Sequence, residues 1–321
     1  MTYDFPMMVL ATLGEVTVFQ TAAFTDADMA LNDIASINCQ SMRQVGQPSY
    51  GKGNIGLHVN DDAVKVLDNR MHLLATINQH LAASHRSPIE SLHWVNQVHG
   101  KQIYDVDTNP LIMQPVDADA LVSPQSNVGL AVMTADCVPI VLYQPTTGKI
   151  AAIHAGWQGL ACGVIKATVE RFTQMGQITA WIGACISQEN YEVNGQVSNK
   201  LLAGCISSQL LADKHIQQFS TLFCNVIDTN ISDAHTLDAN IIDTDMAANS
   251  QGAVSCVAKV HINLPKLAHY QLLHMDVTVA NEGQAPCSYA DGRHYSYRRQ
   301  THLQQPATGR MALIIARSKA L

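Results

Sequence analysis

Three short segments of the chain carry side chains that commonly bind metal ions, each beside an apolar run. His99 lies in the segment NQVHG, Cys137 in TADCVP and His154 in HAGWQG. Two imidazoles and one thiolate suit Zn²⁺, which accepts nitrogen and sulfur donors. Three protein ligands leave a fourth coordination position open, as in catalytic zinc sites, where the metal lowers the pKa of bound water to about 7. These residue types are those of a catalytic zinc site, which makes His99, Cys137 and His154 its candidate ligands.

The same three side chains also permit chemistry without a metal. Cys137 with His99 or His154 would form the nucleophile and base of a cysteine hydrolase, acting for example on an amide of a cell-wall precursor. A structural interpretation is open as well, because a cysteine between apolar runs is usually packed as a small hydrophobe. A metal that only fastens a binding module is a further alternative, which three ligands rather than four disfavour.

Copper is the weaker metal assignment for these ligands. Two histidines, a cysteine and a nearby methionine such as Met133 match the ligand types of a blue-copper site. A multicopper oxidase, however, needs many more histidines in paired His-x-His groups, and none of the 14 histidines of the chain forms such a pair. The sequence therefore favours zinc over copper.

Strand ends are expected to position the three side chains. A predicted strand at Leu92–Val98 precedes the first histidine. Apolar runs at Val128–Met133 and Ile140–Tyr143 flank the cysteine, and the run Ile150–His154 ends in the second histidine. The turn PTTG at 145–148 predicts a hairpin between the last two runs. Strand ends gather at the edge of a sheet, where ligand sites usually lie.

Helical spacing is clearest over residues 61–84, where two aspartates stand at the expected cap. The apolar positions at helical spacing are Val64, Leu67, Met71 and Leu74. The other predicted elements are strands at Val16–Phe19, Ala120–Val122, Ala180–Cys185, Ser296–Arg299 and Ala312–Ala316, helices at Asp26–Ala35, Gly163–Met175, Tyr191–Ser207 and Leu264–His274, a long loop at 41–60 and a polar, irregular stretch at 208–256. This alternation, without a strict β-α-β order, predicts an α/β or α+β domain with mixed sheets.

Composition and charge narrow the class of protein. The chain has 321 residues, of which 47% are hydrophobic, and a formal net charge of −7. The negative charge argues against broad nucleic-acid binding, which needs many Lys and Arg side chains against phosphates. A local basic spot near the C-terminal end suits a small anion better than a duplex. Its members are Arg293, Arg298, Arg299 and Arg310.

The expected compartment is the cytoplasm. No apolar run approaches the roughly 20 residues that cross a bilayer, and Met1–Leu10 lacks the basic region of a signal peptide. The 8 cysteines are scattered and form no Cys-x-x-Cys pair, which is typical of a protein kept in a reducing compartment. The sequence therefore predicts an enzyme with no membrane partner and no nucleic-acid partner, and it sets no oligomeric state.

Several motifs in a fixed order connect the chain to a known family. They are QVHG at 97–100, DADALV at 117–122, TADC at 134–137, HAGW at 154–157, IGACI at 182–186, and SYRR at 296–299 followed by TGR at 308–310. From about Arg43 to Ala316 the sequence resembles the laccase-domain family, also called the multicopper polyphenol oxidase or peptidoglycan-editing-factor family, which is related to purine nucleoside phosphorylases. Gln158 and Gln300 depart from the family pattern, which usually has Arg and an acidic residue there.

The resemblance implies a fold and a domain arrangement. The expected fold is a single four-layer α/β/β/α domain with mixed β-sheets over residues 41–321. Residues 1–40 would be an N-terminal extension or the first strand of that domain, and residues 208–256 would be a possible insertion.

The resemblance also implies a purine nucleoside enzyme. Its reactions would be the phosphorolysis of adenosine, inosine and methylthioadenosine and the deamination of adenosine to inosine, with the editing of peptidoglycan precursors as an alternative. The implied zinc ligands and catalytic residues are again His99, Cys137 and His154. The laccase label would imply copper instead of zinc at these ligands and phenols as substrates. The implied partners are a purine nucleoside and phosphate.

Two residues are candidate substrate contacts under this resemblance. Arg43 would bind substrate or phosphate through its planar guanidinium, with Asn54 as a weaker helper. Arg298 and Arg299 are alternatives, and each arginine could equally form a structural ion pair. Asp136, next to the cysteine ligand, would either orient a metal ligand by a hydrogen bond without touching the metal or cap a turn.

Overall fold

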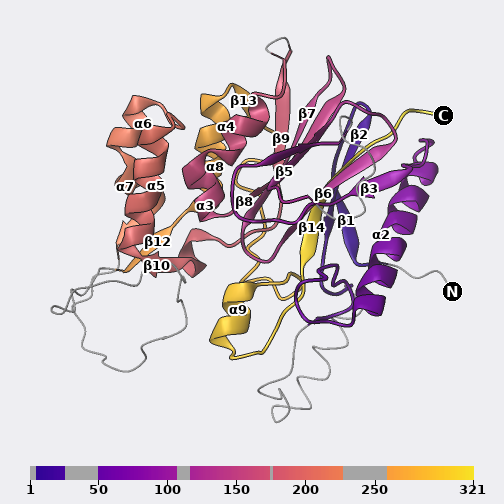
Figure 1. Ribbon diagram of the computed structural model, residues 1–321, viewed down its shortest axis with the longest axis horizontal. Coiled ribbons are helices and arrows are strands. Elements are labelled where there is room, and N and C mark those ends of the chain that lie inside the picture. Colours follow the sequence, from indigo (N-terminus) through magenta and orange to yellow (C-terminus); the bar gives the residue numbers. More distant parts are fainter. Residues whose placement is uncertain (1–4, 26–49, 107–115, 174–175, 227–258) are drawn as a thin grey trace.

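The computed structural model describes residues 5–25, 50–106, 116–173, 176–226 and 259–321. In this part of the chain, helices and three β-sheets form a mixed α/β fold (Figure 1). The expected α/β class with mixed sheets is therefore confirmed. The predicted helix at Asp26–Ala35 lies outside the described residues. No helix in the described ranges is both long enough and apolar enough to cross a bilayer.

The first sheet has five strands in the order β1-β2-β14-β6-β3. They are β1 (Met7–Leu13), β2 (Val16–Thr21), β3 (Ser91–His93), β6 (Val128–Thr134) and β14 (Met311–Arg317). β3 runs parallel to β6, and the other neighbours are antiparallel. The N-terminal strands β1 and β2 thus belong to the same sheet as the C-terminal strand β14.

The second sheet has six strands in the order β13-β9-β7-β8-β5-β4. They are β4 (Ile103–Asp105), β5 (Ala120–Ser123), β7 (Val138–Gln144), β8 (Lys149–Ala155), β9 (Ile178–Ile182) and β13 (Val277–Val279). The third, smaller sheet contains β10 (Glu192–Asn194), β12 (Lys259–Ile262) and β11 (Cys224–Val226), all antiparallel. The predicted hairpin is confirmed, because β7 and β8 pair antiparallel around the 145–148 turn.

Helices cover the sheets on two sides (Figure 1). The helices are α2 (Ala63–Ala83), α3 (Trp157–Cys162), α4 (Val164–Val169), α5 (Gly195–Ser207), α6 (Asp213–Gln217), α7 (Phe219–Phe223), α8 (Leu264–His274) and α9 (Tyr297–His302), with a 3₁₀ turn at Gln188–Asn190. The prediction of a helix at Leu264–His274 is confirmed.

Alternating side chains of the central strands build two separate cores. In β7, Val141 packs with Leu130 and Leu313 of the five-stranded sheet, whereas Ile140 belongs to a cluster that includes Leu267 of α8. Successive side chains of a strand point to opposite faces, so one face of the six-stranded sheet meets the other sheet and the opposite face meets helices.

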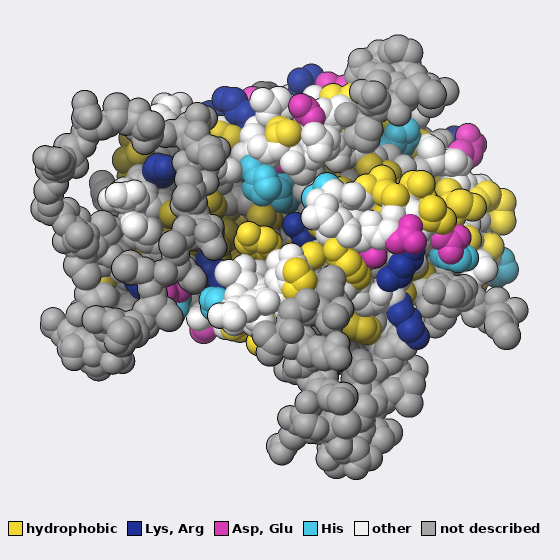
Figure 2. Space-filling model, turned by 60° about the horizontal axis from the view of Figure 1, so that its bottom comes forward, with side chains coloured by type: hydrophobic (Ala, Val, Ile, Leu, Met, Phe, Trp, Pro, Cys, Tyr) yellow, Lys and Arg dark blue, Asp and Glu magenta, His cyan; other side chains and the backbone are white. Residues whose placement is uncertain are grey.

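Helix α2 packs with its own cluster, although not through the stripe that the sequence suggested. Asp62 caps it by accepting a hydrogen bond from the Val64 backbone N–H at 2.9 Å. Val64 and Met71 are 76% and 70% exposed, whereas Leu73 and Ile77 are fully buried. Figure 2 shows hydrophobic side chains gathered on the side where α2 lies in Figure 1. The helix is confirmed, but its buried face is the one that carries Leu73 and Ile77 rather than the one that carries Val64 and Met71.

Two predicted elements differ from the structure. Ser296–Arg299 is not a strand, because the Ser296 hydroxyl accepts a hydrogen bond from the Arg299 backbone N–H at 3.0 Å and thereby starts α9. The predicted helix at Gly163–Met175 is confirmed at its start by α4, which follows Gly163 but already ends at Val169. Gly163, with a φ of 85° in the left-handed region that favours glycine, separates α4 from α3.

Three other boundaries differ from the prediction. The predicted strand at Leu92–Val98 is reduced to β3. The predicted helix at Tyr191–Ser207 begins only at α5, after the short strand β10. The stretch at 208–256, expected to be irregular, forms α6, α7 and β11 in its described part, so that expectation is wrong there.

Candidate metal centre

The structure brings the three predicted metal-binding side chains together. The ligand atoms of His99, Cys137 and His154, called here the His-Cys-His group, all lie within 4.8 Å of one another. Cys137 Sγ lies 3.9 Å from His99 Nε2, and the two imidazole rings are nearly perpendicular with centroids 4.8 Å apart. Two ligands of one tetrahedral zinc ion lie roughly 3.5 Å apart, given bonds of about 2.0–2.3 Å. The group could therefore hold one metal ion.

The β7–β8 hairpin supplies two of the three side chains. Pro139 pairs with His154 and Val138 with Ala155, so Cys137, just before β7, lies beside the end of β8. His99 reaches the same place from the loop between β3 and β4, in a left-handed conformation with a φ of 60°. A non-glycine residue with positive φ is uncommon and needs support from its surroundings.

A glycine keeps the space between the ligands open. A Cβ atom at Gly156 would lie 3.0 Å from Cys137 Sγ and 3.2 Å from His99 Cδ2. Both distances are shorter than comfortable van der Waals contact, so a larger residue at position 156 would displace two of the ligands.

Asp119 fixes both histidines and was missed in the sequence, although it lies in the DADALV motif. It is fully buried, and its Oδ1 lies 2.9 Å from His154 Nδ1. The same oxygen accepts from the His99 backbone N–H at 2.9 Å, and Oδ2 accepts from the Gly100 N–H at 2.6 Å. These bonds support the left-handed His99 backbone and direct His154 Nε2 away from the carboxylate. An acidic residue inside an apolar run was the only signal of this role.

The charges of the group favour the thiolate of Cys137, which is its ligand form, and the protonated form of His154, which must lose its proton to bind a metal. Although burial opposes ionisation, the nearby positive charge of His154 and hydrogen bonds from the histidines lower the pKa of Cys137 to about 6. Burial likewise opposes protonation of His154, but the Cys137 thiolate and Asp119 raise its pKa to about 9. Metals bind the thiolate and release the proton from the imidazole. The donor set, one polarised thiolate and two imidazoles, fits a zinc ion.

Asp136 joins the cysteine loop to the C-terminal part of the chain. Its carboxylate accepts from the Ser288 hydroxyl and from the Arg298 backbone N–H, both at 2.7 Å. Arg298 lies in the first turn of α9, so the contact caps that helix. None of these contacts reaches the His-Cys-His group directly. Asp136 therefore acts as a cap that also holds the backbone next to Cys137.

Arg298 and Arg299 are occupied by backbone carbonyl groups. Arg298 Nη1 donates to the Glu192 carbonyl at 2.6 Å. Arg299 Nη1 donates to the carbonyls of Ser288 at 2.8 Å and Tyr289 at 2.7 Å, and its Nη2 donates to His294. A structural role is thus favoured over substrate binding for both arginines, although their partners are backbone carbonyl groups and not the carboxylates of an ion pair.

The two candidate substrate contacts have different outcomes. Arg43 lies outside the described residues. Asn54 is fully buried, and its Oδ1 accepts from the backbone N–H groups of Gly56 at 3.0 Å and Arg310 at 2.9 Å. Its Nδ2 donates to Asp61 Oδ2 at 2.8 Å. Asn54 can therefore influence a ligand only through the position of Arg310.

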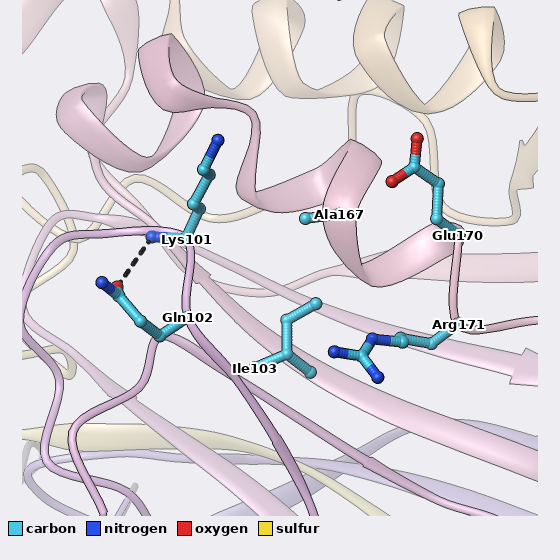
Figure 3. A pocket seen from close by; sticks show the side chains of 6 residues that line it. All are labelled: Lys101, Gln102, Ile103, Ala167, Glu170 and Arg171. Carbon is cyan, nitrogen blue, oxygen red and sulfur yellow. Dashed lines mark hydrogen bonds between the residues drawn. The ribbon is translucent and has the colours of Figure 1, made fainter.

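A cavity of about 430 Å³ lies near the His99 loop but apart from the three ligands. It is lined by Lys101, Gln102, Ile103, Ala167, Glu170 and Arg171 (Figure 3). The Gln102 side chain turns back to accept a hydrogen bond from the Lys101 backbone N–H at 3.1 Å, and Arg171 forms an ion pair with Asp105 at 2.9 Å. None of the His-Cys-His side chains lines it, so this cavity is not the metal centre.

Comparisons with known proteins agree with this picture. The family model described as multi-copper polyphenol oxidoreductase laccase matches residues 38–241 and 231–318. The purine nucleoside phosphorylase YfiH of Escherichia coli is 34% identical over 168 residues, which are 51% of this chain and 65% of that protein. A purine nucleoside phosphorylase of Pseudomonas aeruginosa is 32% identical over 160 residues, 50% of this chain and 60% of that protein. The matches thus span less than two thirds of these relatives.

Solved structures share the fold over nearly the whole chain. A crystal structure of a Neisseria meningitidis protein has a TM-score of 0.65 and 23% identity, and covers 98% of this chain and 100% of its own. The crystal structure of YlmD from Geobacillus stearothermophilus has a TM-score of 0.62 and 21% identity, with 98% and 100% covered. At this identity the likeness concerns the fold alone.

Proposed function

The chain belongs to the multi-copper polyphenol oxidoreductase laccase family, and on that premise we propose that it is a zinc-dependent purine nucleoside phosphorylase. The observation that carries the proposal is the convergence of the His-Cys-His group within 4.8 Å, in a chain similar to several purine nucleoside phosphorylases. The proposed substrates are adenosine, inosine and methylthioadenosine, with the deamination of adenosine as a second reaction.

Zinc is proposed rather than copper because of the number and type of ligands. A multicopper oxidase needs several clusters of histidines, and the described residues contain one group of three or more metal-binding side chains. A zinc ion bound to His99, Cys137 and His154 would act as a Lewis acid on an oxygen of the substrate. Asp119 would keep the His154 imidazole oriented toward it and hold the backbone of His99 in place.

The proposed phosphorolysis moves one proton from phosphate to the purine. A phosphate oxygen forms a bond to C1′ of the ribose, and the bond from C1′ to the purine nitrogen breaks. The purine keeps that electron pair and takes the proton that the phosphate loses, so the products are ribose 1-phosphate and the free base. Catalysis by the chain would consist of binding the phosphate and stabilising the charge on the leaving base.

The proposal also covers the domain arrangement. We treat residues 41–321 as the catalytic domain and residues 1–40 as the source of its first strands, because β1 and β2 pair in the sheet of β14. The separate hydrophobic clusters between α2 and the first sheet, between the two sheets, and between the second sheet and the other helices support a four-layer α/β/β/α order.

A cysteine hydrolase is the second candidate, and one observation favours it. With pKa values of about 6 for Cys137 and about 9 for His154, the pair is a thiolate and an imidazolium at neutral pH, as in enzymes with a cysteine nucleophile. Its substrate would be an amide, such as one in a peptidoglycan precursor. Full activity in strong chelator would support this candidate over the zinc enzyme.

Product analysis tests the proposed function. Purified protein is incubated with adenosine or inosine, with and without phosphate, and free base, ribose 1-phosphate and inosine are measured. Phosphate-dependent formation of ribose 1-phosphate is expected, together with about one equivalent of zinc. The His99→Ala variant should lose the activity; equal turnover by that variant would refute the site, and no ribose 1-phosphate from any nucleoside would refute the phosphorylase.

A further inference from the structure

Arg310 is a largely buried guanidinium without an acidic partner in the part of the chain that the structure describes. Its Nη1 donates to the carbonyls of Gly309 at 3.0 Å and Thr308 at 3.4 Å. Nε and Nη2 have no partner among the described residues, and no carboxylate lies within ion-pair distance there. Withdrawing an unpaired charge from water is costly, so such a group is suited to an anion that arrives from solution.

Strand register places Arg310 beside the metal centre. Met311 in β14 pairs with Thr134 in β6, so Arg310 stands opposite the residues that lead directly into Cys137. The Arg310 backbone is fastened from the other side, because its N–H donates to Asn54 Oδ1 and its carbonyl accepts from the Ile55 N–H at 3.2 Å. Burial lowers the pKa of Arg310, and the nearby charges of Cys137 and Asp136 oppose that effect.

A second arginine is attached to the same backbone segment. Arg70 Nε donates to the Ile55 carbonyl at 2.9 Å, and its Nη2 lies 3.7 Å from Met133 Sδ at the end of β6. The guanidinium is also stacked on Trp94, 4.6 Å from the ring centre. Among the described residues it too has no carboxylate partner. The segment around Ile55 therefore holds two cationic side chains at the end of the strand that precedes Cys137.

His58 completes a cluster of basic groups. It is exposed and follows the segment that holds both arginines. Although the residue is exposed, desolvation of the part of its ring that faces the protein lowers the pKa of His58, and the positive charges of Arg310, Arg70 and His99 lower it further. Figure 2 shows histidine side chains and Lys or Arg side chains close together near the middle of one face of the molecule. An anion would relieve the mutual repulsion of such a cluster.

We infer that Arg310, together with Arg70 and His58, forms a binding subsite for inorganic phosphate beside the His-Cys-His group. The inference rests on the proposed phosphorolysis for the identity of the anion. Arg299 is excluded from this role, because backbone carbonyls occupy both of its Nη nitrogens. Arg298 is directed elsewhere, since its Nη1 donates to the Glu192 carbonyl and its guanidinium lies over the Tyr191 ring, 5.5 Å from the centroid. Arg310 still has N–H donors from two adjacent nitrogens, the planar fork that binds two oxygens of a phosphate.

Direct phosphate binding tests the subsite without turnover. Titration of the metal-loaded protein with inorganic phosphate, followed by calorimetry, is expected to show affinity about tenfold weaker in Arg310→Gln than in the unmodified protein, because charge-assisted hydrogen bonds are lost. Arg310→Lys should recover part of the affinity. The matched control is Arg171→Gln, which removes the same charge at the cavity of Figure 3 and should bind phosphate normally. Equal metal content in all variants is verified first.

The outcomes separate this inference from the proposed function. Unchanged phosphate affinity in Arg310→Gln would overturn the subsite even if the protein is a phosphorylase. Weakened affinity would support the subsite even if no nucleoside is cleaved. If Arg310→Gln fails to fold, Arg310→Lys and His58→Gln decide, and unchanged affinity in both would overturn it. A parallel titration with adenosine 5′-phosphate distinguishes the source of the phosphate group. If Arg310→Gln weakened the binding of the nucleotide but not of inorganic phosphate, the assignment of the subsite to inorganic phosphate would be overturned.

Discussion

The carboxylate of Asp119 contacts both histidines of the metal centre, with Oδ1 2.9 Å from His154 Nδ1 and 2.9 Å from the His99 backbone nitrogen. One buried side chain therefore sets the orientation of one ligand and the backbone conformation of another. The precision of the metal centre depends on this carboxylate as much as on the ligands themselves.

Asp119→Asn should weaken metal binding while all three ligands remain. The NH₂ group of the asparagine would face one of the backbone N–H groups that donate to the carboxylate, so one hydrogen bond would be replaced by a contact between two donors. We therefore expect about 10–100-fold lower zinc affinity, measured by competition with a chromogenic chelator. Asp117→Asn is the matched control, since Asp117 is exposed and its carboxylate accepts a hydrogen bond from Asn96 Nδ2 at 2.6 Å rather than from a histidine of the metal centre. Equal zinc affinity of the Asp119→Asn and unmodified proteins would contradict the role of this carboxylate.

Cys137→Ser should abolish stoichiometric zinc binding. A serine hydroxyl is a poor substitute for a thiolate, and the two imidazoles alone bind the ion weakly. Elemental analysis should give about one equivalent of zinc for the unmodified protein and far less for the variant. Cys162→Ser is the control, because Cys162 is also half-buried and free but lies in α3 outside the group. Full zinc content in Cys137→Ser would remove the cysteine from the site.

Substitutions of Gly156 should act in order of size. The alanine Cβ would press on Cys137 Sγ and His99 Cδ2, and serine would press further. We expect zinc affinity to fall from glycine to alanine to serine, with little change in far-ultraviolet circular dichroism. Zinc affinity that does not change across the series would show that the ligands can move apart freely.

The metal-free protein should show a reactive thiol over a wide pH range. The Cys137 pKa of about 6 predicts that alkylation by iodoacetamide proceeds at neutral pH and slows as the pH falls through about 6, whereas bound zinc protects the thiol. Cys162, whose pKa burial raises, should react slowly. Alkylation that begins only near pH 8 to 9, the ordinary range of a thiol, would contradict the thiolate–imidazolium pair.

The same pair predicts how the stability of the metal-free protein depends on pH. The folded state lowers the pKa of Cys137, so this contribution is complete above the ordinary thiol pKa and is lost as the pH falls through about 6. It raises the pKa of His154, so that contribution is complete below the ordinary imidazole pKa and is lost as the pH rises through about 9. Each shift depends on the charge of the other group, so the attraction within the pair requires both groups to be ionised and should be present between about pH 6 and about pH 9. The difference in melting temperature between the unmodified protein and Cys137→Ser measures this attraction and should shrink on either side of that range.

The structure could be predicted from the sequence where the signals are local. The turn at 145–148 between two apolar runs defines a hairpin by itself, and the hairpin places Cys137 beside His154. Asp119 could not be assigned in this way, and the sequence singles out Arg310 only as one of four arginines in a basic spot. Their roles depend on burial and on which strands are neighbours, and neither property is visible in the motif that contains the residue.

Helix α9 shows the converse case, a local structure stabilised from far away in the chain. Its six residues have no apolar periodicity, and a strand was predicted there. Two caps stabilise the helix at this position. The long-range cap is Asp136, which accepts a hydrogen bond from the Arg298 N–H, and the local cap is Ser296, which accepts from the Arg299 N–H. A short helix of this kind is set by tertiary contacts, which override weak local propensity.

The β7–β8 hairpin has a consequence for the order in which the protein forms. Two of the three ligands are joined by a short stretch of chain, so bringing them together costs little loop entropy, whereas the third must arrive from a distant segment. Hairpins also assemble faster than contacts between remote segments. During folding, the thiolate of Cys137 and the imidazole of His154 would thus be able to bind a metal ion weakly before the rest of the domain has formed. Docking of the His99 loop would then add the third ligand and complete the coordination by the protein.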